Sequence, residues 1–300
     1  MKKFLKRTIT FFIILFLYFL GNIIFNKTII SHNQKQIENV NVLIVGSSNA
    51  AYSLNPELFH SAKNISQTAE SFVMTYWKLK HILQKTKVDT LLIGLSHANV
   101  SEFNDYKFSD KKWSDKMFRR LYPIGNFLKQ KDLKVDYANF LKIYFHNMCL
   151  IPKTSHGNYI GSFVDSNQNN LSSIDEDIKR HYFFYDEELD VSKSAVMHLD
   201  LILQLCGEYN IKPIIVGIPV HKNYYEKIPQ QIKITFEALK QRFLKQNVNF
   251  VDYTDKSYED EFYFDANHLN GKGARIFTAE VIATLRQNVK KNKKGVMKNE

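Results

Sequence analysis

Three residue types that together activate a nucleophile occur near opposite ends of the 300-residue chain. Ser48 follows a short apolar run and Gly46, and Asp265 precedes His268 by three residues. A carboxylate at this spacing can orient an imidazole, which can then deprotonate a serine hydroxyl. A DxxH spacing arises by chance in about half of chains of this length. The hypothesis of a Ser-His-Asp site therefore depends on where the rest of the sequence places the three residues.

Four short apolar runs rich in β-branched residues predict buried strands. They are Asn41 to Val45, Thr90 to Ile93, Pro213 to Ile218 and Val248 to Val251. Apolar residues at helical spacing follow over 191–206, 232–243 and 277–285. Alternating strands and helices predict a three-layer α/β domain with a mostly parallel sheet. Sites in such sheets form beyond the carboxyl ends of the strands, which is where Ser48 and the DxxH pair are expected.

Residues 100–187 interrupt this alternation with aromatic side chains, lysines and a polar stretch. We interpret them as a helical insertion plus a long loop within a domain covering residues 40–289. The aromatic residues fit ordinary packing best, but an insertion beside an active site is also where a substrate groove would form. The chain is completed by an anchor at 1–30, a linker at 31–39 and a basic, disordered tail at 290–300.

An uncharged run of 18 residues, Thr8 to Phe25, follows Lys2, Lys3, Lys6 and Arg7. It spans about 27 Å as a helix, enough for a hydrocarbon core of about 30 Å with snorkelling lysines. The run lacks the small-x-small cleavage site of a signal peptide, so it predicts an uncleaved anchor. Positive charge before it places the N-terminus in the cytoplasm and the following domain outside, as in a single-pass inner-membrane protein with a periplasmic domain.

The formal charge of +11 is concentrated at the two ends of the chain. Residues 1–7 and 290–300 carry +4 each, and the rest carries +3. The folded body is nearly neutral, so nucleic acid is not expected as a partner. Zinc-type spacings are missing from the sequence, and no metal or cofactor is expected. Cys149 and Cys206 could form a disulfide outside the cytoplasm, although Cys206 also fits a buried free thiol.

The two ends of the predicted domain resemble the SGNH/GDSL hydrolase superfamily. VLIVGSSNAAYSLNP is similar to its first block and FDANHLNGKGARIF to its last. The resemblance implies a flavodoxin-like αβα fold with Ser48 as nucleophile, His268 as base and Asp265 as the residue that orients His268. It is strongest with the membrane-anchored branch that acts on cell-surface polysaccharides and cell-wall polymers, including O-acetyltransferases.

The middle blocks differ from the pattern of that superfamily. Residues 64–68 stand where the family has a glycine oxyanion donor, and residues 94–99 where it has GxND. Besides the Ser48 amide, the candidate donors to an oxyanion are Gly94, Ser66, Ser96 and Asn99. His97 follows the same strand, so it could contact the substrate or belong to the core.

Two functions follow from these residues. The first is a membrane-anchored serine esterase or O-acyltransferase acting on a cell-surface polysaccharide or cell-wall polymer, with a membrane protein as a candidate acyl donor. The second is a catalytically silent module that binds a glycan or an export partner. A metal-dependent deacetylase using His97, His221 and His268 ranks last because the ligand spacing is missing.

Overall fold

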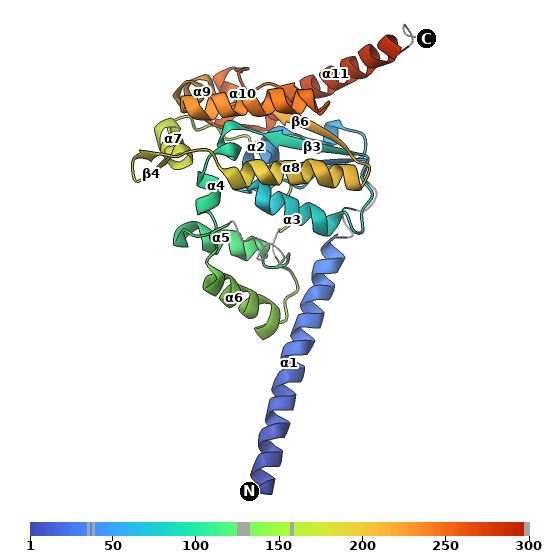
Figure 1. The fold of residues 1–300 in the computed structure, drawn as a ribbon, viewed down its shortest axis with the longest axis vertical. Coiled ribbons are helices and arrows are strands. Elements are labelled where there is room, and N and C mark those ends of the chain that lie inside the picture. Colours follow the sequence, from blue (N-terminus) through green and yellow to red (C-terminus); the bar gives the residue numbers. More distant parts are fainter. Residues whose placement is uncertain (35–36, 38–39, 125–132, 157–158, 297–300) are drawn as a thin grey trace. The chain divides into compact units, whose positions relative to one another are not determined.

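The computed structural model describes residues 1–34, 37, 40–124, 133–156 and 159–296 (Figure 1). The chain forms two compact units, and each is described by itself. One unit comprises residues 1–38 and 107–159, and the other comprises residues 39–106 and 160–300. We call the first the anchor unit, because it contains the N-terminal apolar helix, and the second the sheet unit.

Five parallel strands form the centre of the sheet unit in the order β2-β1-β3-β6-β7. Their bounds are Val42–Val45 for β1, Ala62–Asn64 for β2, Thr90–Leu95 for β3, Lys212–Gly217 for β6 and Asn249–Asp252 for β7. This confirms the predicted α/β fold with a mostly parallel sheet. The spatial order is that of flavodoxin-like sheets, whose sites form between β1 and β3. Strand β2 was not predicted from the sequence, because its residues, AKN, form no apolar run.

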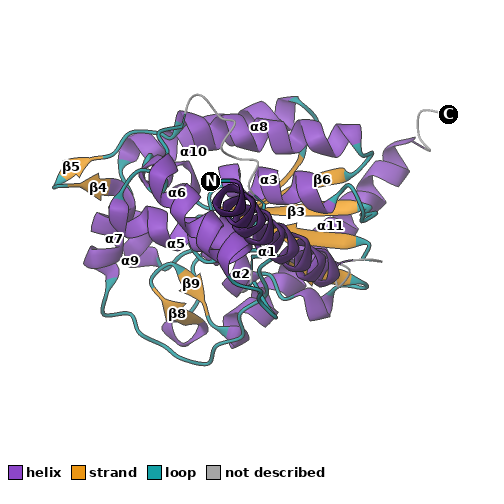
Figure 2. Cartoon of the chain, turned by 90° about the horizontal axis from the view of Figure 1, so that it is seen from below, coloured by secondary structure: helices purple, strands orange, loops and turns teal. Residues whose placement is uncertain are grey.

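Helices cover both faces of the sheet (Figure 2). Ile44, Leu92 and Val216 pack in one apolar cluster with α2 and α11. The opposite layer contains α3, α8 and α10, and Arg242 of α10 donates to Asp200 of α8. The helices of these two layers are α2 (Ser48–Ser53), α3 (Phe72–Ile82), α8 (Lys193–Glu208), α10 (Gln230–Lys245) and α11 (Gly271–Val296). The predicted three-layer arrangement is therefore present.

Short elements complete the sheet unit. The hairpin of β8 (Tyr263–Asp265) and β9 (His268–Leu269) precedes α11, and a second hairpin joins β4 (Phe183–Phe184) to β5 (Glu187–Glu188). The remaining elements of the sheet unit are η2 (Pro56–Leu58), η3 (His97–Val100), α4 (Phe103–Tyr106), α7 (Ile174–Tyr182), α9 (Lys222–Lys227) and η6 (Asp260–Phe262).

The anchor unit contains α1 (Lys2–Gln34), α5 (Lys111–Leu121), α6 (Tyr137–Phe145) and the π-helical turn η5 (His146–Leu150). Helix α1 is long and apolar enough to cross a membrane. Its apolar side chains are mostly exposed, in contrast to a core helix of a soluble domain.

Several predicted segments differ in extent from the elements observed. Residues 31–34 of the predicted linker continue α1, and residues 290–296 of the predicted tail continue α11. Positions 35–36, 38–39 and 297–300 of those two segments lie outside the described residues. Of the predicted insertion at 100–187, residues 107–159 belong to the anchor unit and the rest to the sheet unit.

Close packing at two glycines brings α2 onto the sheet. A Cβ atom at Gly94 would lie 2.5 Å from the Ala50 Cβ, and one at Gly46 would lie 2.7 Å from it. Gly46 also has a φ of +149°, which side chains rarely tolerate. The chain can therefore leave β1 and begin α2 immediately, with Ser48 at the first turn.

We predict that Gly94→Ala destabilises the sheet unit by about 1–3 kcal/mol, because the added methyl overpacks the contact with Ala50. Urea unfolding of the detergent-solubilised chain measures the change. Gly207→Ala on α8 is the matched control, since nothing lies within 4 Å of its added Cβ. That control should leave stability unchanged or raise it by up to about 1 kcal/mol. Equal effects at the two positions would contradict the packing account.

Candidate active site

Ser48, His268 and Asp265 form a chain of hydrogen bonds across the carboxyl edge of the sheet. The Ser48 Oγ lies 2.7 Å from Nε2 of His268. The other ring nitrogen, Nδ1, lies 2.8 and 2.9 Å from the two carboxylate oxygens of Asp265. In this arrangement the imidazole proton is assigned to Nδ1, and Nε2 accepts a hydrogen bond from the serine hydroxyl. The tertiary structure thus brings together the three residues that the sequence singled out.

The β8–β9 hairpin fixes the distance between Asp265 and His268. Asp265 ends β8, His268 begins β9, and the two residues pair across the hairpin. The Asn267 amide also donates to Asp265 Oδ1 over 3.0 Å. Burial raises the pKa of the Asp265 carboxyl, but the charge of His268 and hydrogen bonds from His268 and Asn267 outweigh it, so the pKa is lowered. The carboxylate is therefore ionised at neutral pH and can hold the imidazole.

Aromatic side chains cover the imidazole ring of His268. The Tyr52 ring lies 4.9 Å from it, centroid to centroid, and Phe264 lies 5.1 Å from Tyr52. Tyr52 belongs to α2, four residues after Ser48, so one helix carries both the serine and this covering ring. Burial, and secondarily the charge of Asp265, raises the pKa of the Tyr52 hydroxyl. Tyr52 restricts the orientation of His268 and reduces the access of water to it.

Asn49 connects three loops around Ser48. Its Nδ2 donates to the Asn267 carbonyl over 2.6 Å, and its Oδ1 accepts from Ser47 Oγ at 3.2 Å and from Ser96 Oγ at 3.1 Å. The loops after β1, after β3 and inside the β8–β9 hairpin are therefore held together by one buried amide. The neighbouring Ser47 hydroxyl takes part in this network, whereas the Ser48 hydroxyl contacts His268. Only its place in the first block could have drawn attention to Asn49 in the sequence.

The candidate oxyanion donors have different surroundings. Ser96 and Asn99 form a capping box at η3, in which Asn99 Oδ1 accepts from the Ser96 amide at 2.8 Å. Gly94 lies within β3 beneath Ala50. Ser66 is 1% exposed, and its Oγ has no hydrogen-bond partner among the described residues. Among the described residues, therefore, the Ser66 hydroxyl has no hydrogen-bond partner, whereas Ser96 and Asn99 bond to each other.

A buried ion pair supports the loop that contains Ser66. Lys78 on α3 lies 2.6 Å from Glu70, and its Nζ also donates to the carbonyls of Ile65 and Ile160. Burial lowers the pKa of Lys78, and the charge of Glu70 opposes that shift. Removing one partner would leave a buried charge unpaired, so the pair constrains this loop strongly. This pair was not predicted from the sequence, although a lysine inside the apolar pattern of α3 was a signal for it.

A second polar cluster borders the β8–β9 hairpin, and it was not predicted from the sequence either. His181 Nδ1 lies 2.6 Å from the Tyr224 hydroxyl and 3.4 Å from Asn267 Nδ2, and Tyr224 lies 3.4 Å from the Tyr182 hydroxyl. Asn267 lies between Asp265 and His268 in the sequence, within the turn of the hairpin. Asn49 bonds the Asn267 carbonyl and His181 contacts its side chain, so the turn is held at two points. Nearby, burial raises the pKa of Asp177 on α7, with the charge of Arg180 opposing it.

His97 faces α10 and does not join the chain of hydrogen bonds at Ser48. Its ring stacks on Phe236 at 4.3 Å and meets Tyr225 edge-on at 5.5 Å. Burial lowers the pKa of His97 to about 4, with Asp252 opposing the shift and Lys233 and Lys240 adding to it. Of the two roles open to His97 in the sequence, the geometry favours packing in the core.

His221 and the two cysteines also have defined surroundings. His221 Nδ1 accepts from the Asn223 amide at the start of α9, and its Nε2 lies 3.0 Å from Asp260. His97, His221 and His268 thus have separate partners, and the described residues contain no group of three His, Cys, Asp or Glu side chains placed to hold a metal. Cys149 and Cys206 are free and buried, and burial raises the pKa of Cys206 to about 12.

Comparison with known proteins gives one family. A family model described as DltD protein matches residues 173–278, about a third of the chain. The matched segment begins at α7 and includes Asp265 and His268, but it does not reach Ser48. The chain is therefore similar to that family over the part that carries two of the three residues. No curated protein matches the chain.

We predict that His97 makes stability depend on pH. The unfolded histidine binds a proton below about pH 6.5. The folded one does so only below about pH 4. Unfolding therefore takes up a proton between these values, and stability falls as pH is lowered through them, by up to about 3 kcal/mol.

His97→Phe should remove this part of the pH dependence while preserving the stacking on Phe236. Urea unfolding at pH 7.5 and pH 5 measures it, and His60→Gln, at an exposed histidine, is the control. A His97→Phe variant with the wild-type pH dependence would show that His97 is not the group responsible.

Proposed function

We propose that this chain is a membrane-anchored serine acyltransferase or esterase in which Ser48, His268 and Asp265 form the catalytic triad. The observation that carries the proposal is the continuous hydrogen-bonded chain from the Ser48 hydroxyl to the Asp265 carboxylate. It joins residues separated by more than two hundred positions at the carboxyl edge of the sheet, where α/β enzymes form their sites.

The geometry supports a two-step acyl transfer. His268 Nε2 accepts the proton of Ser48 as Oγ attacks the acyl carbonyl, and the same nitrogen then protonates the leaving group. Asp265 holds Nδ1 and stabilises the imidazolium that forms. An acceptor hydroxyl, or water, next gives its proton to His268 and attacks the acyl-Ser48 ester. Ser48 regains its proton from His268 when the acyl group leaves.

The oxyanion formed in each step needs donors within about 3 Å. The Ser48 amide stands at the first position of α2, where helix amides have no intrahelical acceptor. The Ser66 hydroxyl, which has no hydrogen-bond partner in the part of the chain that the structure describes, is the second candidate in this proposal. Gly94, Ser96 and Asn99 would contribute through the packing and the loop shape that they impose.

The similarity to the DltD family suggests the substrate class. That family is linked to the transfer of D-alanine to teichoic acid, a cell-wall polymer, at the membrane. A serine triad in a chain that also carries an apolar helix long enough to cross a membrane fits such a reaction, because that family acts on its polymer at the membrane. We propose a D-alanyl ester of a teichoic-acid-type polymer as the class of product. The N-terminus is then cytoplasmic and the sheet unit extracytoplasmic.

A catalytically silent module that binds a glycan or an export partner is the second candidate. The observation in its favour is the capping box of Ser96 and Asn99, whose hydroxyl and amide oxygen contact each other. In that case the triad residues would serve only to hold the β8–β9 hairpin against α2.

We predict that a fluorophosphonate modifies Ser48, and that Ser48→Ala or His268→Ala abolishes the modification. Asp265→Asn should preserve the fold and reduce the rate by up to about 10⁴, as in serine proteases, because the amide favours the wrong imidazole tautomer. Mass spectrometry of the labelled peptide identifies the site. Ser47→Ala, which removes a neighbouring hydroxyl bonded to Asn49, should still be labelled. A wild-type chain that is folded and never labels would favour the silent module.

We further predict that loss of this chain lowers the D-alanine ester content of the teichoic acid in its cells. The wild-type chain and Ser47→Ala should restore the esters, whereas Ser48→Ala should not, because only Ser48 can form the acyl intermediate. Alkaline release and quantification of D-alanine from purified polymer measure this. Restoration by Ser48→Ala would contradict an acyl-Ser48 step, and an unchanged ester content after loss of the chain would contradict the substrate class.

A further inference from the structure

Polar side chains on one face of α1 hold the anchor unit together. Asn22 Nδ2 donates to the Cys149 carbonyl over 2.8 Å, and Tyr18 Oη donates to the Leu150 carbonyl over 2.7 Å. Asn26 Nδ2 contacts the Met148 and Ile151 carbonyls at 3.1 and 2.9 Å. Residues 18, 22 and 26 are four apart, so they form one polar stripe along the helix. The stripe satisfies carbonyls at the end of η5 that have no helical partner.

These contacts place η5 at the depth of the membrane if α1 crosses it. Asn26 immediately follows the uncharged run, and Tyr18 lies about 12 Å further along the helix toward the centre of the bilayer. One leaflet of hydrocarbon is about 15 Å thick. The carbonyls bonded by these residues belong to the four consecutive residues 148–151, so they lie within the depth of that leaflet. Backbone can occupy that depth only when its polar groups are satisfied, which the stripe provides.

The exposed side chains of the segment 137–151 agree with this placement. Leu141, Phe145 and Ile151 are 57, 46 and 42% exposed. Phe145 also meets Phe19 of α1 edge-on at 5.5 Å. Large apolar side chains clustered on one surface mark a site of interaction, and acyl chains are the surroundings that α1 itself requires.

Helix α5 supplies positive charge beside this apolar surface. Lys111, Lys116 and Arg119 are exposed, whereas Met117 and Phe118 on the opposite face are buried. Phe118 packs edge-on against Phe140 of α6 at 5.5 Å, which fixes the two helices together. A basic amphipathic helix of this kind is typical of the interface between headgroups and acyl chains.

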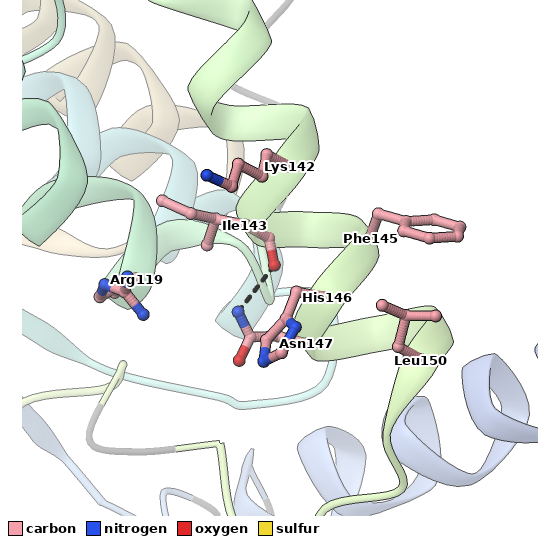
Figure 3. Close-up of a pocket in the computed structure, with 7 residues that line it drawn as sticks. All are labelled: Arg119, Lys142, Ile143, Phe145, His146, Asn147 and Leu150. Atoms are coloured by element: carbon pink, nitrogen blue, oxygen red, sulfur yellow. Dashed lines mark hydrogen bonds between the residues drawn. The ribbon is translucent and has the colours of Figure 1, made fainter.

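A cavity of about 410 Å³ lies between these elements. Its lining residues are Arg119, Lys142, Ile143, Phe145, His146, Asn147 and Leu150 (Figure 3). The Asn147 amide is turned away to the Ile143 carbonyl over 2.7 Å, so most of the lining is apolar. Arg119 and Lys142 add two cationic groups. Arg119 pairs with Asp115 at 2.7 Å, but both side chains are exposed, so water weakens this pair.

We propose that α5, α6 and η5 form a binding site for an anionic phospholipid of the leaflet that surrounds the C-terminal part of α1. An acyl chain occupies the apolar cavity, and the headgroup phosphate lies near Arg119 and Lys142. A soluble phosphate ester would leave the apolar walls without a partner, and a zwitterionic lipid would leave the two cations uncompensated. The site lies wholly in the anchor unit and does not depend on catalysis by Ser48.

Photocrosslinking of the full chain in lipid nanodiscs tests this proposal. Phosphatidylglycerol with a diazirine on one acyl chain should label peptides within 142–150, and the matching phosphatidylcholine probe should label them much less. Lys142→Gln or Arg119→Gln should each lower labelling about five-fold, since one basic residue near an anionic lipid contributes about 1 kcal/mol. Lys134→Gln, an exposed lysine of the same unit outside the cavity, should leave labelling unchanged.

Circular dichroism melting of each variant shows whether it is folded before it is compared. Equal labelling by the two lipids, or labelling that excludes residues 142–150, would overturn the proposal. So would competition by soluble glycerol phosphate, which would indicate a site for the phosphate alone. Fluorophosphonate labelling of Ser48 should be the same in all variants, so failure of the lipid site and failure of the triad are distinguishable.

Discussion

The contact between Ala50 and the two glycines of the sheet is the constraint on which the site depends. Without side chains at Gly46 and Gly94, α2 can begin directly after β1 and lie against β3. This close approach determines where Ser48 stands at the mouth of the sheet. It also determines where Tyr52, one helical turn later, covers the imidazole of His268. A side chain at either glycine would move the serine and its covering ring together.

The β8–β9 hairpin provides the other half of the site, and its position is set by contacts outside the triad. Asn49 bonds the Asn267 carbonyl from the side of α2, while His181 and Tyr224 border Asn267 from the other side. Asp265 and His268 therefore owe their orientation to residues that take no part in the proposed chemistry. An oriented imidazole needs this support, because a shift of about 1 Å is enough to lose productive geometry.

Polar side chains of α1 bond backbone carbonyls inside the anchor unit. Asparagines inside a membrane helix are costly unless they are satisfied, and here each bonds a carbonyl of η5. The helix that attaches the chain to the membrane thereby also organises the segment 137–151. Anchoring and lipid recognition would then have the same structural origin, whereas the proposed acyl transfer belongs to the sheet unit.

The four apolar strands, the α/β class and the apolar N-terminal helix could be predicted from sequence, because periodicity and uninterrupted apolar length are local properties. Ser48, Asp265 and His268 were also identifiable, because each follows or ends a strand and the carboxyl ends of parallel strands share one edge. Strand β2 was not predicted, because AKN is stabilised by its pairing with β1 and has no apolar pattern. The surroundings of His97 and Ser96 were equally inaccessible. Both residues follow β3. The position of α10 decides that the His97 ring stacks on Phe236, and the position of Asn49 decides that the Ser96 hydroxyl donates to it. The sequence determined which residues reach the edge of the sheet, and the tertiary structure decided which of them meet, because contacts between distant segments depend on how the helices pack.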